Sequence, residues 1–220
     1  MDLRELKELV RKGEGKNIEF KLKANHPEKI IREAVAFANS EGGFLLIGVG
    51  DDKSIKGLKF ADEDEYILIK TINERISPPI EYDLERIRVE SEREVLVFKI
   101  KNSAVKPHFV NLDGIIENRK AYVRVEDKSV QASKEVREIL KGETKGRNIK
   151  FHFGDKEKVL MQYLENNSFI TLKTFAEIAT ISTKVASQTL VVLVLANVLK
   201  IKPNEQGDLF VVAAANGSKS

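Results

Sequence analysis

The sequence predicts an α+β fold in which a mixed-sheet domain is followed by a small winged helix-turn-helix domain. In residues 1–142, helical and strand patterns interleave and some strands pair as hairpins, which is typical of a mixed sheet. Residues 156–214 instead give three helical patterns and then two short strands. Residues 143–155 are rich in glycine and basic residues, which predicts a linker, and 215–220 are expected to form a disordered tail.

The first domain opens with a helix and a half-buried strand. Leucines recur on one helical stripe until Gly13, which predicts that the helix stops there. Residues 17–23 then alternate between apolar and polar side chains. Glu19 and Lys21 share the polar face of this strand.

A second helix and a central strand follow. Pro27 suits the first position of a helix. The glycine-flanked apolar run 42–50 is typical of a strand buried on both faces. The remaining elements are expected as a helix over 62–76, strands over 80–90, 94–101 and 121–127, and a closing helix over 132–140 with Ser133 as its N-cap.

The second domain is expected to contain helices over 155–167, 171–180 and 182–199. Ser182 is the expected N-cap of the third helix, and two short strands flank a turn at 204–208. The apolar run 190–196 cannot all face one small core. Part of it is therefore expected to pack against the first domain or a second subunit.

The composition excludes several classes of protein. The chain has no cysteine, which excludes disulfides and thiol chemistry and fits a reducing cytoplasm. No apolar run approaches the ~20 residues of a membrane helix, and the charged N-terminus does not resemble a signal peptide, so no membrane partner is expected. No phosphate-binding loop motif is present, which argues against nucleotide hydrolysis. His108 is expected to pack rather than to catalyse.

Acidic residues are placed to meet near one edge of the predicted sheet. Glu14 and Glu19 precede and occupy the first strand, and Asp51 and Asp52 follow the buried strand. Such carboxylates can hold Mg²⁺ or Mn²⁺, which could activate water against a phosphodiester. The alternative is that Glu19 pairs with Lys21 and the aspartates form an ordinary turn.

The second domain carries candidate contacts to nucleic acid. The helix that begins at Ser182 presents short polar and cationic groups at its N-terminus, where phosphates are favoured. The net charge of +3 is mild, so any basic surface must be local. The candidates are Lys173, Ser182, Thr183, Lys184 and Gln188, with Lys200 and Lys202 on the strands. The alternative is a domain that serves only protein contact.

Three motifs carry a resemblance to a known family. They are Glu14 with Glu19-Phe20-Lys21, the string from Ala36 to Val49, and the pair Lys106-Pro107 with Tyr122-Val123-Arg124-Val125. Over about residues 10–141 the chain resembles the Schlafen AlbA-like domain family, which is found in bacterial regulators and vertebrate Schlafen proteins.

The resemblance implies an AlbA/Schlafen-like fold and DNA binding. In Schlafen nucleases two glutamates and one aspartate are associated with RNA cleavage; carried over, these would be Glu14, Glu19 and either Asp51 or Asp52. Gly50 stands where many members have the first aspartate, which shifts the acids by one residue.

The sequence therefore predicts a bacterial DNA-binding transcriptional regulator, cytoplasmic and homodimeric, that needs no cofactor. Contacts from its first domain are expected at Lys21, Arg119, Lys120 and Arg124. The alternative is a nuclease, dependent on Mg²⁺ or Mn²⁺, that acts on RNA or single-stranded nucleic acid through Glu14, Glu19 and Asp51 or Asp52.

Overall fold

The computed structural model describes residues 1–90, 92–144 and 151–213. The chain divides into two units, Met1–Gln131 and Ala132–Ser220. The helix expected to close the first domain belongs to the second unit, since its apolar side packs there. Part of the expected linker, 145–150, and the expected tail lie outside the described residues.

The first unit is an α+β fold with a mixed sheet, as the sequence predicts. Its elements in chain order are α1 (Leu3–Lys12), β1 (Ile18–Lys21), α2 (Pro27–Asn39), β2 (Gly43–Ile47), α3 (Ala61–Arg75), β3 (Ile76–Ser77), β4 (Tyr82–Glu90), β5 (Arg93–Ile100), β6 (Phe109–Val110), η1 (Ile116–Asn118), β7 (Tyr122–Val125) and β8 (Lys128–Gln131).

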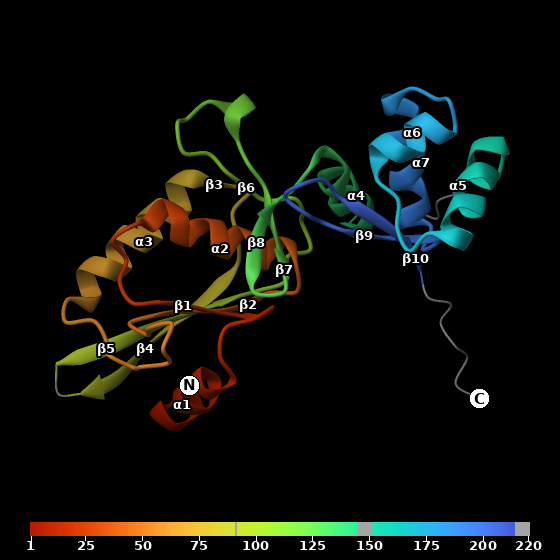
Figure 1. Cartoon of the computed structure of the whole chain (residues 1–220). Coiled ribbons are helices and arrows are strands. Elements are labelled where there is room, and N and C mark those ends of the chain that lie inside the picture. The colour runs from red at the N-terminus through yellow and green to blue at the C-terminus, as the bar shows by residue number, and fades with distance from the viewer. Residues whose placement is uncertain (91, 145–150, 214–220) are drawn as a thin grey trace. The chain divides into compact units, whose positions relative to one another are not determined.

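The main sheet has the strand order β1-β2-β5-β4. β1 runs parallel to β2, and the other neighbours are antiparallel. Helices α2 and α3 cover one face of the sheet and α1 covers the other (Figure 1). Leu45 packs toward the first face and Leu46 toward the second, which confirms that β2 is buried on both sides.

The alternation predicted for β1 is also confirmed. Phe20 is fully buried in the core beneath α1, whereas Glu19 and Lys21 interact with each other on the other face. At the entry to β2, Gly42 has a φ of +77°, a left-handed conformation that favours glycine. The strand therefore begins at the glycines that precede the apolar run in the sequence.

Residues 121–131 form a hairpin rather than the single strand expected there. β7 pairs with β8 in antiparallel register, and the turn between them includes Glu126 with a φ of 56°. The hairpin packs against α2. The alternation of apolar and polar residues is weak in β8, which is short. The sequence alone therefore predicts only β7.

The second unit contains α4 (Lys134–Thr144), α5 (Asp155–Asn166), α6 (Leu172–Ile178), α7 (Thr183–Leu195), β9 (Leu199–Lys202) and β10 (Leu209–Val212). β9 and β10 form an antiparallel hairpin. The axes of α6 and α7 differ in direction by 114°. The expected caps are confirmed: the hydroxyl of Ser182 accepts a hydrogen bond from the Val185 backbone N at 3.3 Å, and that of Ser133 from Val136 N at 3.1 Å.

The apolar run in α7 is buried in part within this unit, while Val191, Val192 and Val194 are half-buried. Leu190 and Leu193 are buried in its core. On another side α4 packs against α7 so closely that a Cβ at Gly142 would lie 2.5 Å from Leu195. No single helix among the described residues is long and apolar enough to cross a bilayer; the bent pair α6 and α7 meets those criteria only together.

Candidate nucleic-acid interface

The candidate carboxylates near the ends of β1 and β2 are engaged separately: Glu14 and Asp52 each have a local hydrogen-bond partner. Glu14 Oε1 accepts a hydrogen bond from the backbone N of Phe20 at 2.9 Å. Asp52 Oδ1 accepts from the backbone N of Ser54 at 3.0 Å and from its hydroxyl, which lowers the pKa of Asp52. Asp51 is exposed in the turn after β2.

This arrangement does not fit a divalent metal ion. Within residues 1–90, 92–144 and 151–213, no three histidine or acidic side chains are grouped so that they could hold one. Mg²⁺ and Mn²⁺ prefer several oxygen ligands around one point. The structure therefore does not bring together the carboxylates that the nuclease alternative requires.

Glu19 belongs instead to a buried ionic cluster, which we call the arginine clasp: Glu19, Glu33, Arg124 and Ser129. Arg124 Nη1 lies 3.1 Å from Glu19 Oε2 and 2.6 Å from Glu33 Oε2. Its Nη2 donates to the carbonyl oxygen of Gly15 at 2.7 Å. The clasp thus connects β1, α2 and the β7–β8 hairpin.

The clasp holds Glu19 buried and Glu33 half-buried. Burial raises the pKa of Glu33 above its usual range, and the negative charge of Glu19 adds to the rise. The Ser129 hydroxyl and the Arg124 guanidinium oppose it. The Arg124 side chain is 0% exposed and also lies over the ring of Phe37, at 4.8 Å from its centroid. Arg124 is therefore the buried cation that contacts both carboxylates, and Lys21 forms a further ion pair with Glu19.

The four residues of the first unit that are expected to contact DNA differ in their exposure to solvent. Arg124 requires a correction: a buried guanidinium bonded to two carboxylates cannot reach a phosphate. Lys21 forms an ion pair with Glu19, as the alternative interpretation of that strand holds. Arg119 and Lys120 are exposed, although the Arg119 guanidinium lies 4.3 Å from the Phe109 ring centroid. His108 is fully buried, as expected.

The start of α7 presents the candidate contacts of the second unit to solvent. Ser182, Thr183, Lys184 and Gln188 are all exposed. Further along the helix Ser187 is buried and donates to Glu135 on α4. Because α4 covers this side of the helix, the exposed polar surface of α7 lies in its first two turns.

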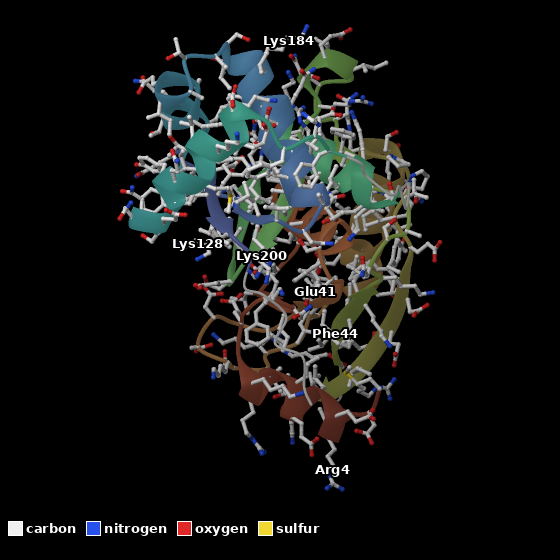
Figure 2. All side chains as sticks on the ribbon, turned by 90° about the vertical axis from the view of Figure 1, so that its right-hand side faces the viewer. Arg4, Glu41, Phe44, Lys128, Lys184 and Lys200 are labelled. Atoms are coloured by element: carbon white, nitrogen blue, oxygen red, sulfur yellow. The ribbon has the colours of Figure 1, made fainter. Side chains whose placement is uncertain are left out.

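The other candidate cations lie on neighbouring elements. Lys200 and Lys202 are exposed on β9, two residues apart and so on one side of the strand. Figure 2 shows Lys184 and Lys200 well apart within the second unit. Lys173 Nζ, on α6, lies 4.0 Å from Glu177. Among the residues that the structure describes, no acidic side chain forms an ion pair with Lys184, Lys200 or Lys202.

Two groups of interacting residues have no signal in the sequence. Glu33 and Ser129 complete the clasp, yet Glu33 reads as one more polar residue on an amphipathic helix. Glu135 and Asp208 lie near each other in the second unit, although α4 appears in sequence to belong to the first domain. Only tertiary packing brings these partners together.

Comparisons with known proteins agree with the fold of the first unit. The model of the Schlafen, AlbA_2 family matches residues 14–133, more than half of the chain. None of the curated proteins matches the chain.

Two solved structures show a more distant likeness. The N-terminal domain of a RecG-related protein from Nitrosomonas europaea is 20% identical with a TM-score of 0.40, over 50% of this chain and 82% of that one. The DIP2311 protein from Corynebacterium diphtheriae is 16% identical with a TM-score of 0.44, over 90% of this chain and 39% of that one. We draw no functional conclusion from either.

Proposed function

The chain belongs to the Schlafen, AlbA_2 family, which is associated with nucleic acids, and from this premise we propose that it is a DNA-binding transcriptional regulator. In this proposal the second unit is a winged helix-turn-helix that contacts the duplex. The protein acts in the cytoplasm as a homodimer, a state that sedimentation velocity would test.

The arrangement of the second unit supports this assignment. Helices α6 and α7 meet at 114°, within the range typical of a helix-turn-helix. Each begins at a hydroxyl N-cap, Thr171 and Ser182 respectively. The β9–β10 hairpin follows directly, in the position of a wing.

The observation that carries the proposal is the exposed first turn of α7. The helix N-terminus bears partial positive charge and free backbone N–H groups, both of which favour phosphate. Lys184 adds a full charge that no acid in the described residues neutralises. Gln188, one turn further along, is able to hydrogen-bond a base edge. Lys200 and Lys202 supply a second, separate phosphate contact.

Replacing Lys184 with alanine is expected to weaken DNA binding and its dependence on salt. Each neutralised phosphate contributes about 0.9 to the slope of log K against log salt concentration, so Lys184→Ala should reduce that slope by about one. Fluorescence anisotropy of a labelled duplex, measured with the full chain over a range of NaCl concentrations, gives both quantities.

Lys158→Ala is the matched control. Lys158 is an exposed lysine on α5, 3.6 Å from Asp155, and its loss should leave the slope unchanged. A flat salt response of the unmodified protein would contradict the phosphate mechanism. Equal effects of the two substitutions would exclude α7 as the contact.

The nuclease alternative predicts a different result. We expect no cleavage of tRNA in the presence of Mn²⁺ beyond that of a protein-free sample, because Glu14, Glu19 and Asp51 are not gathered around a common point. Gel electrophoresis of the incubated RNA measures this directly.

Asp51→Asn is the informative variant for that experiment. Asp51 is exposed, so its replacement leaves the fold intact, whereas Glu19→Ala would also disrupt the arginine clasp. Cleavage by the unmodified protein that Asp51→Asn abolishes would establish the nuclease in place of the regulator.

A further inference from the structure

A groove of about 780 Å³ opens in the second unit. It is bounded by the start of α4, by α6, by the start of α7 and by the turn between β9 and β10. Its apolar wall is formed by Leu172, Ala176, Ile181 and Phe210. Sites for small organic ligands are typically about 300–1,000 Å³ and largely apolar with a few polar groups, so this groove is of a suitable size and character.

Three carboxylates line the groove: Glu135, Glu177 and Asp208. Glu177 lies near Lys173, whereas the other two have no such neighbour. Glu135 is only 8% exposed, and its Oε1 accepts a hydrogen bond from the Ser187 hydroxyl. Among the described residues, Glu135 Oε2 has no hydrogen-bond partner. Asp208 accepts from the Ser133 hydroxyl through Oδ2 and from the Asn204 backbone N through Oδ1, at 3.3 Å.

Neither of these two carboxylates is paired with a cation. No lysine, arginine or histidine in the described part of the chain forms an ion pair with Glu135 or Asp208. The one lysine that lines the groove, Lys173, is 87% exposed and lies near Glu177 instead. Burial raises the pKa of Asp208 above its usual range, and the negative charge of Glu135 adds to the rise.

Glu135 is buried and Asp208 is half-buried. A carboxylate partly withdrawn from water without a cation is costly, and a bound cation would lower that cost. We propose that the groove binds a small organic cation, an amine with an apolar body. The ammonium group contacts Glu135 and Asp208, and the apolar body packs on Leu172, Ile181 and Phe210. This site does not depend on the proposed binding of DNA.

Isothermal titration calorimetry of the full chain with phenethylamine tests the proposal, with 2-phenylethanol as the uncharged ligand of similar size. The ammonium group makes charge-assisted hydrogen bonds that the alcohol cannot make. The alcohol is therefore expected to bind with an affinity roughly ten- to a hundredfold lower. Equal binding of the two compounds, or no binding of the amine, would overturn the proposal.

Glu135→Gln removes the charge and keeps an oxygen for the Ser187 hydroxyl. It is expected to weaken amine binding roughly tenfold or more, and Asp208→Asn is expected to do the same. Glu205→Gln is the matched control, because Glu205 is exposed in the same turn and does not line the groove. It should bind phenethylamine as the unmodified chain does.

Melting temperatures identify any variant that fails to fold. The two acids are on different elements, α4 and the β9–β10 turn. If one of the two variants fails to fold, amine binding by the other variant still tests the proposal. A folded Glu135→Gln or Asp208→Asn protein with unchanged affinity would overturn the proposal. So would a loss of affinity in Glu205→Gln as large as theirs, since the effect would then be one of overall charge.

Discussion

Replacing Arg124 with methionine is expected to lower the free energy of unfolding of the first unit by about 3–5 kcal/mol. The substitution keeps a long apolar side chain over Phe37 and removes the only cation of the clasp that contacts both Glu19 and Glu33. Two carboxylates are then left buried without that counter-charge. Hydrogen exchange of the β2 backbone amides, followed by mass spectrometry in the full chain, reports the free energy of opening of this unit alone.

The control for this experiment is Arg88→Met. Arg88 is exposed on β4, and its replacement is expected to change the free energy of opening by less than about 0.5 kcal/mol. Adding Glu33→Gln to Arg124→Met should recover part of the loss, because one uncompensated charge is removed. If Arg124→Met resembles Arg88→Met, the clasp does not stabilise the fold.

Replacing Gly42 with alanine is expected to cost about 3 kcal/mol or more. Gly42 has a φ of +77°, and a Cβ there would lie 2.7 Å from the carbonyl oxygen of Ile100 and 2.9 Å from the backbone N of Asn102. Backbone strain and a clash with a neighbouring strand therefore add together. The same exchange measurement on β2 and β5 gives the loss.

Gly114 separates the two contributions. Its φ is +81°, yet nothing lies within 4 Å of the position that its Cβ would occupy. Gly114→Ala should therefore show the strain alone, about 1–2 kcal/mol. Equal losses for the two glycines would mean that the close approach at Gly42 is relieved by a backbone shift.

The sheet of the first unit could be predicted because its signals are local. Alternation places Phe20 and Glu19 on opposite faces of β1, and the glycine-flanked apolar run identifies β2. The arginine clasp could not be predicted in the same way. Arg124 and Glu33 are 91 residues apart, and they meet only because the β7–β8 hairpin packs on α2. Without the second strand of that hairpin, Arg124 looks like an exposed strand cation.

The second unit shows the same limit. Ser133 and Ser182 are identified as N-caps because a cap acts within three residues of its own helix. The element against which α4 packs could not be predicted. An apolar stripe indicates that one side of a helix is buried, but it does not identify the neighbouring element. The sequence therefore predicts α4 as a helix at the end of the first domain, whereas its contacts lie in the second unit. Whether Lys184 and Gln188 bind DNA stays a prediction.

The clasp also has a consequence for how the chain is made on the ribosome. The two acids emerge early, at positions 19 and 33, whereas their shared cation and the Ser129 hydroxyl are synthesised about a hundred residues later. Until then Glu33 lacks its guanidinium partner, and Glu19 has only Lys21 as a counter-charge. The clasp can consequently form only after translation has passed the β7–β8 hairpin.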